Sequence, residues 1–282
     1  MYFDKSASSL PEQTPADSER AVAHVKTTFK VMQFNMQFGQ GWDDHDPDHA
    51  PVDLGLTIAA IRAQDADIVL LQEVEQVRAR GGQPWTPPNY TRLRAALRAY
   101  HGYFAYRPPD ARELPFGIGL AILSKTPLRG RMRRGLPSPP IEFEFNGVKT
   151  TPTDRLLIGA STLLAGRELR IYNTHLLAFF MLKAQYDEPA GQREIIIDEL
   201  HAAQGAVLLG GDFNVSKHLA LVSQFSAAGY QTVQDQEITW RRRPYVLDHI
   251  FYNRQLRALR HAVQPTLASD HHILTAEFEF ID

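Results

Sequence analysis

The sequence contains no cysteine among its 282 residues. This absence excludes a disulfide scaffold, a cysteine nucleophile, a thiolate zinc site and an iron–sulfur cluster. Long apolar runs are missing too, because the longest comprise only seven or eight residues, as in 116–123 and 176–182. A membrane-spanning helix needs about 20 consecutive apolar residues, so no transmembrane segment is predicted.

The first thirty residues lack the apolar stretch of a signal peptide. The default expectation is a cytoplasmic protein, with secretion after removal of a leader as the alternative. Residues 1–28 are polar and rich in serine and proline, which predicts a disordered or loosely attached tail. No linker or internal repeat divides the remainder, so a single domain is expected over 29–282.

Excess charge of either sign is also missing, because 30 basic and 32 acidic residues leave a net charge of −2. Proteins dedicated to duplex DNA usually carry a basic surplus, since phosphate contacts supply much of their affinity. The balance therefore argues against a dedicated duplex-binding protein.

Short segments that alternate with period two, or that are rich in β-branched and aromatic residues, predict strands. These segments are 29–35, 67–73, 103–107, 118–124, 141–145, 156–164, 169–175, 206–210, 246–252, 256–263 and 273–280. Helical periodicity fits 54–63, 92–100, 191–203 and 217–227. Many strands and few helices favour the α+β class, with two packed sheets flanked by helices.

Polar and acidic side chains recur at the ends of these apolar strands. They are Asn35, Glu73, Asn173, His175, Asp212, Asn214, Asp248, Asp270 and His271. Buried polar groups cost free energy unless they are paired, so a fold that gathers them indicates a function. Carboxylate and amide oxygens suit Mg²⁺ or Mn²⁺, and histidines could bind or polarise an anionic oxygen. An Asp with an Asn could place a water molecule for attack.

Seven segments occur in a family's characteristic order from Lys30 to the C-terminus: FNMQFGQGWD, ADIVLLQEVE, IGLAILSKTPL, YNTHL, LGGDFN, VLDHIFYN and SDHHI. The sequence thus resembles the endonuclease/exonuclease/phosphatase superfamily, metal-dependent phosphoesterases that share the fold of deoxyribonuclease I. The resemblance implies a four-layer sandwich with two mostly antiparallel sheets between helices. It also implies that water, activated in the site, attacks phosphorus with the help of Mg²⁺ or Mn²⁺.

By this resemblance, Glu73 is the principal metal ligand, with Asn35 beside it and Asp270 contributing to the same site. The sequence differs from one branch of this superfamily at two positions that bear on the substrate. Apurinic-site endonucleases carry an acidic residue where this chain has Gln37 and a tyrosine where it has Gly117, so that specialised activity is disfavoured.

The same resemblance assigns the catalytic roles. His175 and His271 would contact the scissile phosphate, and Asp248 would hold His271 in the right tautomer. Asp212 would orient or deprotonate the attacking water, and Asn214 would fix the phosphate or the metal.

Substrate contacts are expected from Asn173, Arg241 and Arg242, although the arginines also fit a surface charge run. The run LLAFFML after His175 fits an apolar leaving group or lipid, with core packing as the preferred interpretation. A phosphodiesterase or nuclease is the leading prediction. The alternatives are a sphingomyelinase-like phospholipid or small-molecule phosphodiesterase, and a non-catalytic phosphate-binding module. No obligate protein partner is evident.

Overall fold

The computed structural model describes residues 28–77, 87–108, 110–114, 116–182 and 190–281. The predicted tail lies outside the described residues except for Thr28, which begins the first strand. No helix among the described residues is long and apolar enough to cross a membrane.

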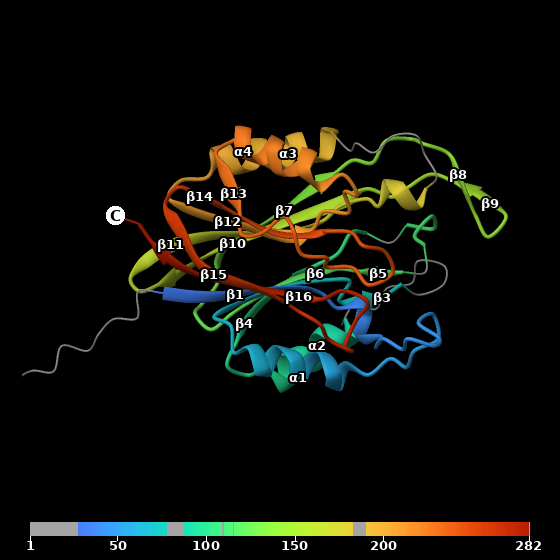
Figure 1. The fold of residues 1–282 in the computed structure, drawn as a ribbon, viewed down its shortest axis with the longest axis horizontal. Helices are drawn as coiled ribbons and strands as arrows, with labels where there is room; N and C mark the ends of the chain where they lie inside the picture. The colour runs from blue at the N-terminus through green and yellow to red at the C-terminus, as the bar shows by residue number, and fades with distance from the viewer. Residues whose placement is uncertain (1–27, 78–86, 109, 115, 183–189, 282) are drawn as a thin grey trace, which may run out of the picture.

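Two six-stranded sheets form the centre of the molecule (Figure 1). The first sheet has the order β15 (Leu256–Gln264), β16 (Ile273–Phe280), β1 (Thr28–Asn35), β2 (Ile68–Gln72), β6 (Leu120–Ser124) and β4 (His101–Ala105). The second has the order β13 (Tyr230–Thr232), β14 (Asp248–Asn253), β12 (Ala206–Asp212), β11 (Arg167–His175), β10 (Arg155–Leu164) and β7 (Arg129–Leu136). Neighbouring strands are antiparallel except for the parallel pairs β1–β2 and β11–β12.

Helices cover the outer faces of both sheets, which gives four layers (Figure 1). α1 (Leu54–Gln64) and α2 (Pro88–Ala96) pack on the first sheet, and α3 (Ala190–Ala202) and α4 (His218–Ala227) pack on the second. The expected four-layer α+β sandwich, the fold of deoxyribonuclease I, is confirmed. Two small two-stranded sheets complete the described structure: β3 (Glu75–Gln76) with β5 (Gly117–Ile118), and β8 (Phe143–Phe145) with β9 (Val148–Thr150).

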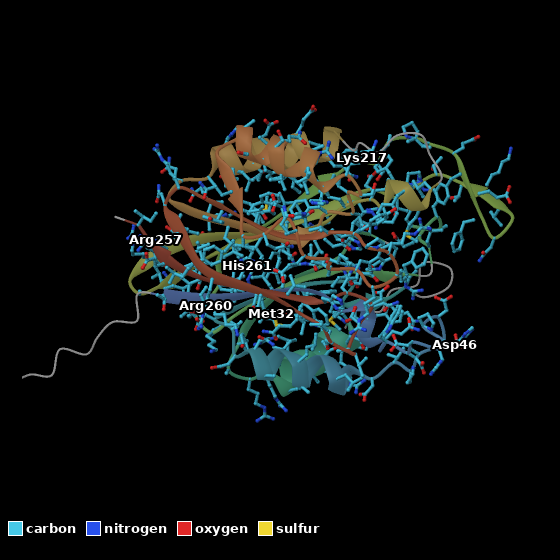
Figure 2. All side chains as sticks on the ribbon, viewed as in Figure 1. Met32, Asp46, Lys217, Arg257, Arg260 and His261 are labelled. Atoms are coloured by element: carbon cyan, nitrogen blue, oxygen red, sulfur yellow. The ribbon has the colours of Figure 1, made fainter. Side chains whose placement is uncertain are left out.

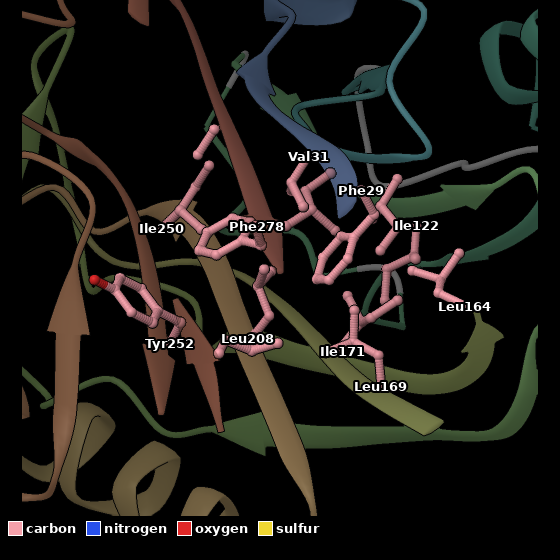
Figure 3. Packing of buried hydrophobic residues seen from close by; sticks show 14 of the residues in the cluster. Phe29, Val31, Ile122, Leu164, Leu169, Ile171, Leu208, Ile250, Tyr252 and Phe278 are labelled. Carbon is pink, nitrogen blue, oxygen red and sulfur yellow. The ribbon is translucent and has the colours of Figure 1, made fainter. Parts of the chain in front are cut away.

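The alternation of side chains along the central strands explains the layering. Val31 and Leu208 point between the sheets, where they join a buried apolar cluster that also includes Phe278 (Figure 3). Their neighbours Met32 and Val207 point outward, under the helices. Because both faces of these strands are covered, their sequences are almost continuously apolar.

Helix boundaries depend on local and on distant contacts. α1 begins where the Asp53 carboxylate accepts the N–H of Gly55 (2.8 Å), a side-chain cap that the sequence displays. α2 begins at Pro88, four residues before the predicted start. The carboxylate of Glu75, on β3, accepts hydrogen bonds from the backbone N–H groups of Asn89 (3.2 Å) and Tyr90 (2.8 Å). These first-turn N–H groups have no partner within the helix itself.

Charged side chains protect the edges of the sheets. β7, which sequence periodicity did not predict, is an edge strand whose arginines at positions 129, 131, 133 and 134 are exposed. On β15, an edge strand of the first sheet that carries the labelled Arg257 and Arg260 (Figure 2), Arg257 pairs with Glu279 and Arg260 pairs with Glu277. Charges on edge strands discourage pairing with other chains, and they also hide the apolar alternation that identifies a strand.

The pairing of β11 with β12 leaves no room for a side chain at Gly211. A Cβ atom there would lie 2.5 Å from the backbone oxygen of Thr174. We expect Gly211→Ala to lower the free energy of unfolding by about 1–3 kcal/mol, since the backbone cannot move aside cheaply. Urea denaturation measures this, with Gly135→Ala on β7 as the control because a Cβ there meets no atom within 4 Å. Equal stability of the two variants would contradict the prediction.

Candidate active site

The ends of the central strands meet at one edge of the sandwich. In the second sheet His175 lies beside Asp212, and Asp212 lies beside Asp248, by strand register. Here opens a pocket of about 590 Å³. Of the predicted residues, the pocket is lined by Glu73, His175, Asp212, Asn214, Arg242, Asp270 and His271.

Asn35 joins the two halves of the site. Its side-chain amide donates to Oε1 of Glu73 and to Oδ2 of Asp212, both at 3.0 Å. Glu73 belongs to the first sheet's side of the pocket and Asp212 ends β12 of the second. One amide therefore holds the two carboxylates in register across the sandwich.

Glu73 is held in a strained position. Its backbone is left-handed (φ 50°), which costs free energy for a residue with a side chain. The Gly117 N–H donates to Oε2 of Glu73 at 3.0 Å, and a Cβ on Gly117 would collide with the Glu73 side chain. Burial raises the pKa of Glu73, although hydrogen bonding by Asn35 opposes this effect. The glycine noted in the sequence thus makes room for this carboxylate.

His271 and Asp248 form a buried pair. Nδ1 of His271 lies 2.8 Å from Oδ2 of Asp248, which fixes the tautomer and directs Nε2 toward Asp212. Gln33 donates to the other oxygen of Asp248 at 3.1 Å. Burial disfavours the charged ring, but the carboxylates of Asp248 and Asp212 outweigh burial and raise the pKa of His271. The two carboxylates therefore favour the imidazolium form of His271.

Asp212 lies between two imidazoles. Its Oδ2 is 3.5 Å from Nε2 of His175 and 3.6 Å from Nε2 of His271. Burial raises the pKa of Asp212, while the charge of His271 acts in the opposite direction. Burial lowers the pKa of His175 well below its ordinary value, and Arg155 adds to this shift. One neutral and one charged imidazole thus flank a carboxylate that can accept a proton.

Asn214 adopts a left-handed backbone (φ 50°) directly after β12. Its N–H donates to Oδ1 of Asp212 at 3.0 Å and its side-chain amide donates to the Leu176 oxygen at 3.1 Å. The side chain is therefore fixed at the pocket wall beside Asp212.

The buried carboxylates fit a divalent cation. Asp212, Asp248 and His271 offer ligand atoms within 4.8 Å of one another, but Nδ1 of His271 is already bonded to Asp248. Glu73 and Asp270 are further carboxylates that line the pocket. Glu73 and Asp212 share one neutral amide, and burial raises the pKa of both. Buried negative charge that lacks a full counter-charge is costly, and carboxylate and amide oxygens are the donors that Mg²⁺ and Mn²⁺ prefer.

Asp270 faces the pocket but is already engaged by a cation. Nε of Arg242 lies 2.7 Å from Oδ2 of Asp270, and its guanidinium also contacts Asp48 at 2.6 Å. The indole N–H of Trp240 donates to the same oxygen at 3.1 Å. The second oxygen, Oδ1, is contacted only by the Ser269 hydroxyl, at 3.5 Å, among the bonds of the described residues.

Two predicted substrate contacts lie away from the pocket. Asn173 is completely buried, and its side chain is used by hydrogen bonds to Gln72 and to the backbone oxygens of Leu71 and Ala121. Arg241 donates to the Thr266 oxygen at 2.5 Å and does not line the pocket. The structure therefore does not bring either residue to the pocket lining, and their contact with substrate stays a prediction.

Sequence reasoning missed Arg155, the first residue of β10. Its side chain lines the pocket beside His175, and its Nε is buried without a hydrogen-bond partner among the described residues. Burial lowers the pKa of Arg155, against the effect of nearby carboxylates. The only sequence signal is its place at the start of an apolar strand, after a turn-rich segment.

The sequence profile described as "Endonuclease/Exonuclease/phosphatase family" matches residues 32–271. The chain belongs to this family. Its members are phosphoester hydrolases that generally depend on a divalent metal ion. No curated protein matches the chain.

Solved structures of the family share the fold. The endonuclease/exonuclease/phosphatase from Beutenbergia cavernae is 21% identical, with a TM-score of 0.67 over 90% of this chain and 72% of that one. The mannosyl-6-phosphatase from Bacteroides thetaiotaomicron is 15% identical, with a TM-score of 0.63 over 89% and 100%. The catalytic domain of human Nocturnin, solved with a sulfate anion, is 20% identical, with a TM-score of 0.59 over 90% and 95%.

Arg155 provides the test of anion binding in the pocket. We expect Arg155→Gln to weaken the binding of inorganic phosphate about 10- to 100-fold, because charge-assisted hydrogen bonds are lost. Titration calorimetry measures the effect. Arg112→Gln is the control, since Arg112 also lines the pocket but is paired with Asp110 at 2.7 Å. If the Arg155→Gln protein binds phosphate as tightly as the Arg112→Gln protein, Arg155 does not contribute to anion binding.

Proposed function

We propose that this protein is a Mg²⁺- or Mn²⁺-dependent phosphodiesterase that activates water to attack phosphorus. The observation that supports the proposal best is the position of Asp212, whose Oδ2 lies within 3.6 Å of the Nε2 atoms of His175 and His271. A proton acceptor between a neutral and a charged imidazole suits the addition of water to a phosphate ester.

Each residue of this group has a distinct role in the proposal. Asp212 orients the attacking water and takes its proton. His271, kept charged by Asp248, stabilises the negative charge that develops on the phosphate oxygens. His175, as a neutral ring, donates a hydrogen bond to the same group. Asn214 fixes the phosphate next to Asp212, where its own backbone is anchored.

The metal site of the proposal consists of Glu73, Asn35 and Asp270. A divalent ion bound there supplies positive charge that polarises the phosphate. Arg155, unpartnered at Nε, adds a fixed positive charge beside His175. Arg242 positions Asp270 through their ion pair. Of the two arginines predicted to contact the substrate, Arg241 and Arg242, only Arg242 lines the pocket in the described structure.

Loss of His271 should abolish hydrolysis. We expect His271→Ala to lower kcat/KM for bis-p-nitrophenyl phosphate in Mg²⁺ or Mn²⁺ by about 10²- to 10⁴-fold, because charge stabilisation at the phosphate is lost. His272→Ala is the matched control, since His272 is adjacent in sequence but does not line the pocket. Release of p-nitrophenol, also followed with p-nitrophenyl phosphate, measures both variants.

Removal of the metal ion with EDTA should stop the reaction, and added Mg²⁺ or Mn²⁺ should restore it. Hydrolysis that persists in excess EDTA would exclude the metal site. Phosphate binding without any turnover would favour the non-catalytic binding module.

The rate should depend on pH through Asp212 and His271. Asp212 must be unprotonated to take the proton of water, so activity should fall as the pH drops through the raised pKa of Asp212. His271 must be protonated to stabilise the phosphate, so activity should fall as the pH rises through the raised pKa of His271. We expect Asp248→Asn to move the alkaline limb of kcat/KM to lower pH, because the nearest carboxylate that raises the pKa of His271 is lost. Asp198→Asn, on the exposed side of α3, should leave the profile unchanged.

A further inference from the structure

The pocket is lined by two chemically different sets of side chains. The polar set comprises the groups already described. The apolar set consists principally of Phe38, Leu114, Phe116, Phe143, Leu177 and Met181. We call these six residues the apolar wall. The proposed hydrolysis of a phosphate group uses none of them, so their presence beside the reacting group needs a separate explanation.

The hairpin of β8 and β9 contributes to the apolar wall although it lies outside the sandwich (Figure 1). Phe143 and Phe145 are half-buried, whereas Glu142 and Glu144 on the alternate positions are exposed. The ring of Phe145 packs edge-on against Phe116 at 5.8 Å between centroids. A peripheral hairpin has no core to fill, so its aromatic face serves the pocket.

The segment after β11 also contributes to the apolar wall. Leu176 and Phe179 are fully buried in the protein, as core packing predicts, but Leu177 and Met181 line the pocket. Met181 is 50% exposed and Phe116 is 41% exposed. Large apolar side chains left open beside a catalytic centre indicate a binding surface for an apolar group.

The charges at the pocket rim do not favour a polyanion. Arg112 is neutralised by Asp110 at 2.7 Å, and Arg242 is neutralised by Asp48 and Asp270. Nucleic-acid duplexes bind through many free cations that contact successive phosphates. Of the four arginines that line this pocket in the described part of the chain, these two are paired within the protein, which leaves Arg155 and Arg243 to contact an anion.

We propose that the substrate is a small phosphate ester with an aromatic group, whose ring lies against the apolar wall while its phosphate lies between Arg155 and His271. This inference rests on the proposed function and names its substrate class. The volume of about 590 Å³ falls within the range of roughly 300–1,000 Å³ typical of small-molecule sites. Three phenylalanine rings and a thioether favour a planar aromatic group over an aliphatic chain, because ring pairs and sulfur–ring contacts add to simple burial.

Non-hydrolysable phosphonates test the inference without interference from leaving-group reactivity. Binding of methylphosphonate, benzylphosphonate and heptylphosphonate to the Mg²⁺-loaded protein is measured by titration calorimetry. The last two have the same number of carbon atoms, but one carries a rigid aromatic ring and the other a flexible aliphatic chain. We expect benzylphosphonate to bind at least about tenfold more tightly than methylphosphonate, because burial of the ring removes apolar area from water. We also expect it to bind more tightly than heptylphosphonate.

Two variants on the β8–β9 hairpin test whether the preference for benzylphosphonate depends on Phe143. Phe143→Ala should reduce the preference for benzylphosphonate over methylphosphonate to about threefold or less, with methylphosphonate affinity unchanged. Val148→Ala is the matched control, because Val148 lies on the same hairpin, is 65% exposed and does not line the pocket. Circular dichroism checks that both variants are folded.

The outcomes separate this inference from the proposed function. Equal binding of methylphosphonate and benzylphosphonate, a preference for heptylphosphonate, or an unchanged preference in Phe143→Ala would overturn the aromatic substrate and leave phosphate hydrolysis standing. Failure of methylphosphonate and inorganic phosphate to bind at all, together with no hydrolysis of either nitrophenyl ester, would overturn the proposed function itself.

Discussion

A chain of buried side-chain hydrogen bonds between the two sheets sets the geometry on which the site depends. Gln33 and Gln72 of the first sheet bond to each other in both directions, and they reach Asp248 and Asn173 of the second sheet. Buried polar groups of this kind are costly when unpaired, so the sheets have one relative position in which all are satisfied. In that position Asn35 reaches carboxylates on both sides of the pocket, and Asp248 is held against His271.

Much of the fold could be predicted because local sequence and tertiary structure agree. The continuously apolar strands are those covered on both faces, and α1 begins at a side-chain cap visible in the sequence. The start of α2 could not be predicted, because Glu75 satisfies its first N–H groups from a distant strand. β7 could not be predicted for a different reason, because an edge strand rich in arginine lacks the apolar alternation by which strands are identified.

The sequence predicted which residue types gather at the strand ends, but it did not predict how far each side chain lies from the pocket opening. Asn173 and His175 do share a face of β11, but the pocket opens only at the strand end, so His175 lines it while Asn173 lies between the sheets. Periodicity gives the direction of a side chain and not its distance from the opening. Arg155 carries no motif of its own. Its importance depends on the absence of a partner for Nε, which becomes visible only in three dimensions.

The pairing of β1 with β16 has a consequence for how the protein is made. These strands come from opposite ends of the sequence, with Thr28 beside Glu279, yet both lie inside the first sheet. Asp270 and His271 precede β16 directly. During synthesis, the first sheet and the site therefore cannot close until β16 has left the ribosome, and long-range pairing of this kind is slow to form. The part of the chain that precedes β16 should accordingly lack a closed pocket.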